Sequence, residues 1–262
     1  MFRYIKIYLF FFRTDIKRIK MYRSNLIASS LGYLTESVAT FFSIWLIFSQ
    51  TNVLGQWKSS EMFALFAYTL LLMTIWEFFL VNTLEIPYLI NNGELDVFLL
   101  RPVSLLYQFI IFELDEEALF ELVTSLGMLL FAISISGPNI SIMSFALFIG
   151  GTLSAILSLQ ALYLAISSSA FWFQSADGLR SIAYQVLQFN RYPLSIYPRL
   201  IQTLMTILPF GMYGYFPLHV FLFPNTSMYE ILYSLLAGPV FLLISYNLCW
   251  KQGLKKYSSS AG

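Results

Sequence analysis

The chain has 262 residues, of which 58% are hydrophobic and only 11% are charged, and its mean hydropathy is +0.71. Because soluble domains carry about 25% charged residues, this composition excludes an ordinary globular core and indicates a polytopic membrane protein. The formal net charge of +1 gives no electrostatic basis for binding nucleic acid. A single cysteine, Cys249, excludes an internal disulfide and is interpreted as a small apolar helix residue.

The first 24 residues combine basic and aromatic side chains. A cleavable signal peptide would have one short apolar run followed by a small-residue cleavage site, and this pattern differs from that. We expect an amphipathic helix over 1–24 that lies on the inner leaflet, and the alternative is a solvated basic tail. The basic residues of the segment are Arg3, Lys6, Arg13, Lys17, Arg18, Lys20 and Arg23.

A helix that crosses a bilayer needs about 20 apolar residues. The sequence predicts an all-α polytopic membrane protein with six transmembrane helices, a single domain over residues 1–262. A sixth apolar stretch within 178–222 is interrupted by prolines. The five continuous stretches are 26–49, 62–81, 118–136, 143–170 and 229–250.

The basic residues predict the orientation of these spans. If the N-terminus is inside, every Lys and Arg except Lys58 lies in an inner segment, as the positive-inside rule requires. We therefore expect both termini to be cytoplasmic. The inner segments are then 1–24, 82–117, 171–199 and 251–262.

The fifth span allows two interpretations. In the first, residues 200–222 cross the membrane. In the second, the crossing starts near Gly178, and residues 194–222 form a re-entrant hairpin at the outer face, where surrounding protein buries the irregular backbone. Arg180, Arg191 and Arg199 favour the first interpretation. The prolines that favour the hairpin are Pro193, Pro198, Pro209 and Pro217.

The sequence lacks the patterns of most catalytic and cofactor sites. It contains no Gly-x-x-x-x-Gly-Lys-Ser/Thr loop to hold ATP phosphates and no nucleophile elbow. The only histidine, His219, is interpreted as an interfacial residue, so a metal site would have to be all carboxylate. We expect no catalytic residue, no metal and no cofactor on this chain itself.

Several carboxylates lie in or near apolar stretches. Glu36 is in the middle of the first span, where a charge costs about 2.5 kcal/mol or more. It either lines a translocation route or subunit interface, or only packs two helices. Glu77 is interpreted as interfacial. A cluster of acidic residues precedes and begins the third span: Glu113, Asp115, Glu116, Glu117 and Glu121. This cluster either forms a solvated acidic face or binds a basic partner, such as the N-terminal helix or another subunit.

A structured polar segment follows the second span. Pro87 and Gly93 are expected to bracket a short helix or turn with exposed acids, and Arg101-Pro102 to restart the chain toward the membrane as a helix start. Its Leu and Phe residues need a surface that buries them. The residues assigned to contact a partner are Asn91, Asn92, Gly93, Glu94, Leu95, Asp96, Arg101 and Pro102.

Two motifs carry a family resemblance. Gly93-Glu94-Leu95-Asp96 is followed by Leu99-Leu100-Arg101-Pro102 and Tyr107-Gln108. The second motif runs from Arg191 to Pro198, followed by Leu208-Pro209-Phe210 and Tyr215-Phe216-Pro217. Together they resemble the signature of type-2 ATP-binding-cassette (ABC) transporter permeases of the six-span subfamily, over nearly the whole chain.

The resemblance implies partners and roles. Such permeases form homodimers or heterodimers and recruit two cytoplasmic ABC ATPase subunits, which bind ATP and Mg. Residues 83–100 would then be the coupling helix, and 1–24 a connecting helix. The outer gate would contain Pro193, Pro198, Pro209 and Pro217. The expected location is the bacterial cytoplasmic membrane.

These observations favour the permease subunit of an ATP-driven exporter, and export follows from the resemblance alone. The main alternative is an ion-coupled secondary transporter that uses Glu36. A third is a membrane partner that does not transport, such as an immunity or sensor subunit. The short outer loops point weakly to a lipid, peptide or amphipathic drug as substrate.

Overall fold

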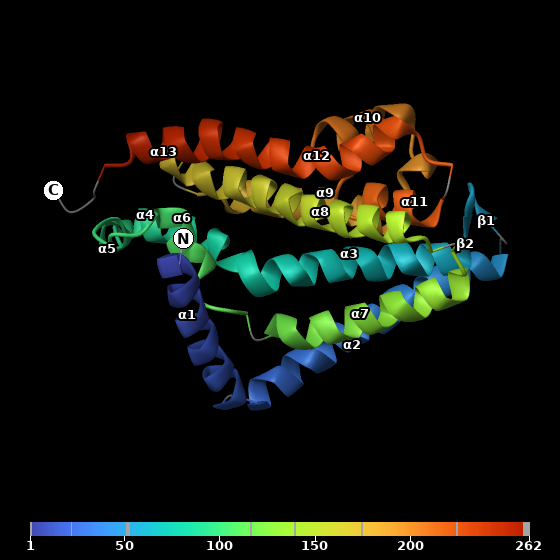
Figure 1. The fold of residues 1–262 in the computed structure, drawn as a ribbon, viewed down its shortest axis with the longest axis horizontal. Coiled ribbons are helices and arrows are strands. Elements are labelled where there is room, and N and C mark those ends of the chain that lie inside the picture. The colour runs from blue at the N-terminus through green and yellow to red at the C-terminus, as the bar shows by residue number, and fades with distance from the viewer. Residues whose placement is uncertain are drawn as a thin grey trace.

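Long helices build most of the computed structural model (Figure 1). It describes residues 2–21, 23–50, 53–115, 117–138, 140–173, 175–223 and 225–258; many side chains around the α1–α2 junction, including that of Glu36, lie outside the described set. The long helices are α1 (Phe2–Met21), α2 (Arg23–Gln50), α3 (Ser59–Leu80), α7 (Glu117–Ser136), α8 (Ile142–Ser168) and α12 (Met228–Ile244).

Short elements connect these helices. Two strands, β1 (Val53–Leu54) and β2 (Trp57–Lys58), pair antiparallel. The short α-helices are α4 (Ile86–Asn91), α5 (Leu95–Leu99), α6 (Leu105–Ile110), α9 (Asp177–Leu187), α10 (Arg199–Ile207), α11 (Tyr215–Leu222) and α13 (Lys251–Lys256). The 3₁₀ segments are η1 (Val81–Glu85), η2 (Ser169–Phe171), η3 (Gln188–Arg191) and η4 (Leu194–Ile196), and the π-helical η5 (Ser245–Trp250) follows α12.

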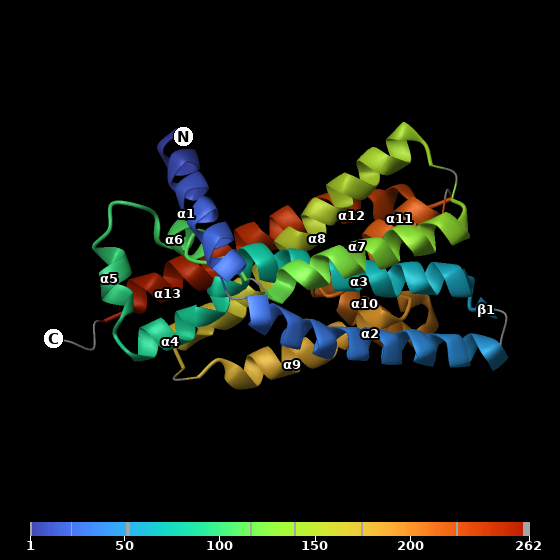
Figure 2. The same cartoon turned by 90° about the horizontal axis from the view of Figure 1, so that it is seen from below.

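The bundle has two distinct ends. Both termini lie at one end, together with α4, α5, α6 and α13, and we call it the termini end (Figure 1). The opposite end holds β1, β2, α10 and α11, and we call it the hairpin end. The first helix, α1, runs across the direction of the long helices in both views (Figure 2).

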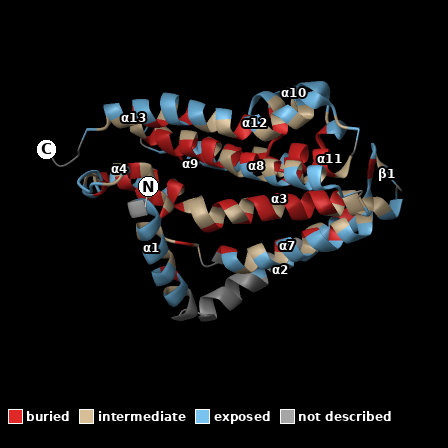
Figure 3. Ribbon diagram, viewed as in Figure 1, coloured by how far each residue is buried: buried red, intermediate tan, exposed pale blue. Residues whose placement is uncertain are grey.

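Helix α3 is the centre of the bundle (Figure 3). Its sequence is apolar on all sides, which is typical of a helix that protein surrounds. Trp76 is fully buried, stacks on Tyr163 with ring centroids 4.3 Å apart, and donates its indole N–H to Gln160 at 2.9 Å. Gln160 in turn donates to Thr83 at 3.0 Å, so a buried polar chain ties α3 and its extension to α8.

Small residues bring α8 and α12 into close contact. Gly238 donates its backbone N–H to the Ser154 hydroxyl at 3.0 Å, and a Cβ at Gly238 would lie 1.7 Å from the Ser154 carbonyl oxygen. A Cβ at Gly151 would likewise lie 2.5 Å from the Ser234 hydroxyl oxygen. Without a hydrophobic driving force between helices in lipid, such close backbone approach is a main source of packing energy.

Four helical stretches of the described residues are long and apolar enough to cross a membrane. They are Ser59–Asn91, Ala118–Ser136, Ile142–Phe171 and Met228–Lys256. The helices predicted over 62–81, 118–136, 143–170 and 229–250 are thus present. Apolar side chains such as Val123, Phe131 and Leu243 are exposed on their outer surfaces, as expected of helices that face lipid.

Residues 177–222 contain five short helical pieces, α9, η3, η4, α10 and α11, instead of one long helix. α9 and η3 carry the chain toward the hairpin end, and α10 and α11 lie there, separated by a turn at 208–214. Gly214 in this turn has a φ of 98°, which only glycine adopts without strain. No single helix therefore covers 200–222.

One predicted inner segment is wrong at its far end. A Cβ at Gly55, in the β1–β2 turn, would lie 3.7 Å from Ile196, so residues near Ile196 and the start of α10 lie at the hairpin end. Arg199 therefore lies at the same end of the bundle as Lys58. It is not part of the inner segment that was predicted to extend from 171 to 199. The charge pattern missed this because α9, η3 and η4 are each shorter than a span, so the chain between 177 and 196 contains no apolar stretch that marks a crossing.

Candidate functional site

The segment between α3 and α7 folds at the termini end as three short helices. α4, α5 and α6 bury their apolar sides in a small core that also contains side chains of α8 and η5. The predicted need for a burying surface is thereby confirmed. The core consists of Ile86, Leu89, Leu95, Phe98, Leu105, Phe109, Leu164 and Trp250.

The expected helix over 83–100 is divided in two. Gly93 has a φ of 72°, in the left-handed region that L side chains rarely adopt. The chain turns at this residue, and α4 and α5 point in different directions (Figure 2). Pro87 is the second residue of α4 and does not precede it, whereas Gly93 follows the end of α4 as predicted; α5 is an additional element.

The two helices bury one side and expose the other. Leu95 and Phe98 of α5 are buried, whereas Val97 is 55% exposed and Leu100 is 86% exposed. Tyr88 of α4 is 57% exposed. Together with exposed polar residues they form what we call the α4–α5 face. Its members are Tyr88, Asn91, Asn92, Glu94, Val97, Leu99 and Leu100. An apolar patch with a polar rim is typical of an interaction surface.

Arg101 and Pro102 belong to a bend between α5 and α6. The Arg101 guanidinium lies 4.8 Å from the centre of the Phe98 ring, a cation–π distance. The prediction that Pro102 starts a helix is wrong, because α6 begins at Leu105 with Ser104 as its N-cap residue. The Gln108 side-chain amide stabilises the bend by donating hydrogen bonds to the Phe98 and Val103 carbonyl oxygens at 2.9 and 3.0 Å.

Asp96 differs from the expectation of an exposed acid. It is half-buried, on the side of α5 that meets the C-terminal segment. Burial and the nearby Asp96 carboxylate raise the pKa of the Tyr257 phenol. Glu85 and Glu94 are exposed as predicted, so Glu94 is the acid of the Gly93–Asp96 motif that a partner can reach.

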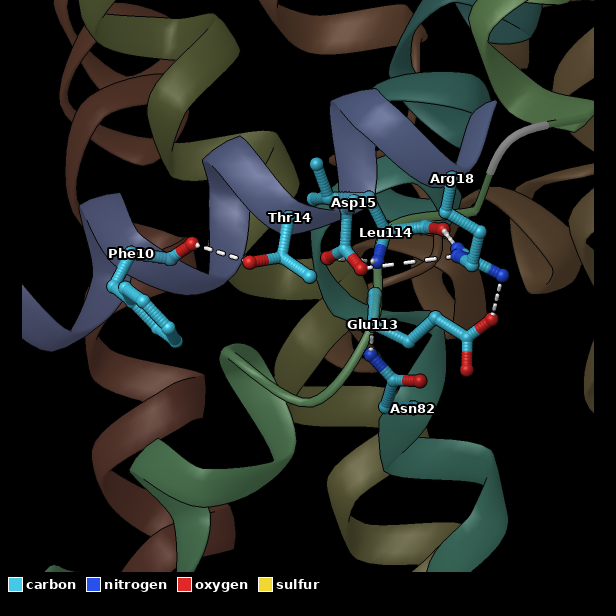
Figure 4. A network of polar contacts seen from close by, with 7 residues as sticks. All are labelled: Phe10, Thr14, Asp15, Arg18, Asn82, Glu113 and Leu114. Carbon is cyan, nitrogen blue, oxygen red and sulfur yellow. Dashed lines mark hydrogen bonds and ion pairs between the residues drawn. The ribbon is translucent and has the colours of Figure 1, made fainter. Parts of the chain in front are cut away.

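A polar network joins α1 to the segment between α6 and α7 and to η1 (Figure 4). Arg18 forms an ion pair with Glu113 and donates to the Leu114 carbonyl oxygen at 2.8 Å. Asp15 accepts the Leu114 N–H at 3.2 Å, and Asn82 donates to the Glu113 carbonyl oxygen at 2.6 Å. The prediction of a basic partner from the N-terminal helix is confirmed for Glu113. Glu116 and the Glu117 side chain lie outside the described residues.

A polar cavity of about 210 Å³ lies between α3, α7, α9 and η3. Glu77, Glu121 and Arg191 are its charged lining residues. Sequence reasoning missed this site, although an acid in each of two apolar spans was a usable signal. Glu77 was interpreted as interfacial, and in the structure it is half-buried along the cavity wall.

The prolines of the hairpin end occupy positions where helices start or the chain turns. Pro193 and Pro198 are the N-cap residues of η4 and α10, Pro209 lies in the turn before α11, and Pro217 is in the first turn of α11. At these positions the backbone N–H that proline lacks is not needed for a helical hydrogen bond, so proline destabilises the structure little.

His219 is buried at the hairpin end instead of lying at an interface. Its Nε2 lies 3.2 Å from Gln56 Nε2, and its Nδ1 lies 3.6 Å from the Glu230 carboxylate. Trp57, Tyr215 and Phe223 surround its ring. The contact with Gln56 therefore joins the β1–β2 turn to α11.

The Glu36 side chain lies outside the described residues, so its role in a translocation route stays a prediction. Within the part of the chain that the structure describes, no group of three or more His, Cys, Asp and Glu residues is placed to hold a metal ion.

A multi-pass helical membrane protein is the class that these observations define. Residues 34–261 match the family described as ABC-2 family transporter protein. The chain therefore belongs to this family of ABC transporter membrane proteins, the permease component and not the ATPase. A search of the curated proteins found no match.

Proposed function

We propose that the chain is the permease subunit of an ATP-driven exporter in a bacterial cytoplasmic membrane. Separate cytoplasmic ATPase subunits bind ATP and Mg, and a second permease, identical or related, completes the translocation unit. The family supports the pairing with an ATPase. The whole chain acts as one transmembrane domain.

Six crossings are proposed for this domain: α2, α3, α7, α8, α12 and one within 178–222, where α9 and η3 carry the chain toward the hairpin end. An even number of crossings puts both termini on one side, and they do lie at one end of the bundle (Figure 1). Basic residues cluster in the terminal segments, which favours the cytoplasm for that end. α1 then lies along the inner membrane surface, across the bundle axis.

Residues 194–222 are proposed as a re-entrant outer gate. α10 has 9 residues and α11 has 8, so at 1.5 Å per residue each is about 12–14 Å long, less than half of the apolar bilayer thickness. The 208–214 turn reaches into the bundle, where Tyr213 donates to the Thr69 carbonyl oxygen at 2.8 Å. Surrounding protein thereby buries the irregular backbone, as membranes require.

The α4–α5 face is the observation that carries the docking proposal. It combines exposed apolar side chains with the exposed carboxylate of Glu94, and it lies at the termini end, where a cytoplasmic ATPase would bind. In water, burial of Leu100, Val97 and Tyr88 against a partner would stabilise the complex by about 25 cal/mol per Å² of apolar area removed from solvent.

The structure also contains a physical path from this face to the membrane helices. Phe98 stacks on Phe109 with centroids 5.4 Å apart, and Phe109 meets Trp250 of η5 at 6.3 Å. We propose that a displacement of α5 would reach η5, which continues α12, through these ring contacts. Coupling of this kind needs two discrete arrangements that ATP binding biases differently.

The test is co-expression of the chain with candidate ABC ATPases, followed by co-purification and ATPase assay. Glu94→Lys reverses an exposed charge on the face and should lower co-purification and stimulated ATPase activity at least several-fold. Lys58→Glu, a charge reversal at the hairpin end, serves as the matched control and should leave both unchanged. Full assembly and activity of Glu94→Lys would contradict the docking role.

A further inference from the structure

A second cavity, of about 180 Å³, lies where α2, α3 and α7 meet near the hairpin end (Figure 1). Its lining is apolar except for Ser59 and Ser60, the first two residues of α3. We call it the apolar cavity. Its larger apolar side chains come from all three helices and are Phe41, Phe63, Phe66, Met128, Phe131 and Ile135.

The apolar cavity is kept open by small residues and lies next to the outer surface. Ala67 of α3 and Ala132 of α7 are buried in its wall, and their short side chains leave the space unfilled. Phe41 stacks on Phe63 with ring centroids 4.4 Å apart, which joins α2 to α3. Phe131, in contrast, is exposed on the outer surface of α7. The cavity therefore adjoins a surface that faces lipid when α7 crosses a membrane.

The polarity and size of the apolar cavity favour an apolar occupant over water. A buried water needs two to four polar partners, and only the serines at one end offer any. Apolar cavities of about 150 Å³ stay dry and take up benzene, so this one has room for about six carbon atoms. Lipid acyl chains are the apolar groups that surround a membrane protein. Wall atoms that lack contacts in an empty cavity would gain van der Waals contacts with such a chain.

The polar end of the apolar cavity suits the headgroup of the same lipid. Lys58 is exposed and directly precedes Ser59. The Glu61 carboxylate in the same turn is already engaged, because it accepts the Lys58 backbone N–H at 2.7 Å. The Lys58 ammonium is thus the group that can attract a lipid phosphate. Positive charge at one end and apolar walls beyond it match the two parts of a phospholipid.

We propose that the apolar cavity binds one acyl chain of a glycerophospholipid, which enters from the leaflet at the hairpin end and stays as a resident lipid. The chain fills the junction of α2 with α3 and α7, and the phosphate lies beside Lys58. Phe66 lines both this cavity and the polar cavity, so the bound chain is one side chain away from the polar cavity. The inference depends on the membrane location of the chain and not on an ATPase partner.

The test uses native mass spectrometry of the purified full-length chain in detergent, supplemented with palmitoyl-oleoyl phosphatidylethanolamine. One phospholipid per chain is expected to survive removal of the detergent. Phe131→Ala removes part of the wall at an exposed position, where folding is little affected, and should lower the retained fraction several-fold. Phe145→Ala is the matched control, because Phe145 is also exposed and lies on α8 outside the cavity. It should retain the lipid like the wild type.

A second pair of variants fills the apolar cavity instead of opening it. Ala132→Leu places an isopropyl group in the space and should abolish retention, whereas Ala146→Leu adds the same group at an exposed position of α8 and should not.

Equal retention by Phe131→Ala and Phe145→Ala, or a wild-type chain without phospholipid, overturns the proposal. A dimer free of lipid would overturn it too, by showing that a second copy of the chain covers the cavity. Since no ATPase is present, a failure here is distinct from a failure of ATPase docking at the α4–α5 face.

Discussion

Arg18 shows how a single side chain joins distant parts of the sequence. It contacts residues 95 and 96 positions away, through an ion pair with Glu113 and a hydrogen bond to Leu114. Both charged side chains keep part of their surface exposed, at 31% and 45%. Screening by solvent therefore limits the ion pair to about 1 kcal/mol or less.

Arg18→Gln should release this link and lower the thermal midpoint of the detergent-solubilised chain by about 1–3 °C. Arg13→Gln, on an exposed position of the same helix, should leave the midpoint unchanged. The measurement is fluorescence-monitored thermal unfolding of the two variants side by side. An equal effect of both would show that the contact with Glu113 and Leu114 contributes nothing specific.

Gly93 and Glu94 could be predicted as site residues from the sequence, but the contacts that other site residues make in the fold could not. Gly93 was recognisable because glycine between helical residues signals a turn, and Glu94 because it follows that turn. The half-buried position of Asp96 depends on Tyr257, which lies 161 residues later in the chain, so no local pattern contains it. The cavity charges of Glu77, Glu121 and Arg191 likewise meet only after folding.

At the scale of elements, the contact between α8 and α12 depends on the absence of a side chain at Gly238. A methyl group there would overlap the Ser154 carbonyl oxygen, which belongs to backbone that cannot rotate away. In lipid, this close approach replaces the hydrophobic force that holds helices together in water.

Gly238→Ala should destabilise the bundle by about 1–3 kcal/mol through overpacking, seen as a lower midpoint in denaturant or heat. Gly127→Ala is the matched control on α7, because a Cβ at Gly127 has no other group within 4 Å. The higher helix propensity of alanine should leave that variant unchanged or slightly more stable. If both substitutions behave alike, the close contact with Ser154 is not a determinant of stability.

Long helices were predictable and short ones were not, for a physical reason. α3, α7, α8 and α12 each need about 20 apolar residues, so composition alone marks them. The pieces between residues 177 and 222 are shorter than a span, and their directions depend on Pro193, Pro198 and the turn at Gly214. The β1–β2 hairpin was missed because two-residue strands leave no periodic pattern.

At the scale of the whole molecule, the proposed coupling requires that the ATPase binds at one particular end of the bundle. The termini end has the α4–α5 face, both termini and the anchored α1 helix (Figures 1 and 4). The hairpin end has the short β-hairpin and the proline-rich helices. All contacts that link Phe98 to Trp250 lie on the termini side, so the mechanism fails if the ATPase binds elsewhere.

Site-specific photocrosslinking tests this most directly. A photoreactive phenylalanine analogue is placed at Leu100, which is 86% exposed at the termini end, and separately at Ile142, which is 92% exposed at the start of α8 near the hairpin end. In membranes that also contain the partner ATPase, the account predicts a permease–ATPase adduct from position 100 and none from position 142. An adduct from position 142, or its absence from position 100 in an assembled and active complex, would contradict it.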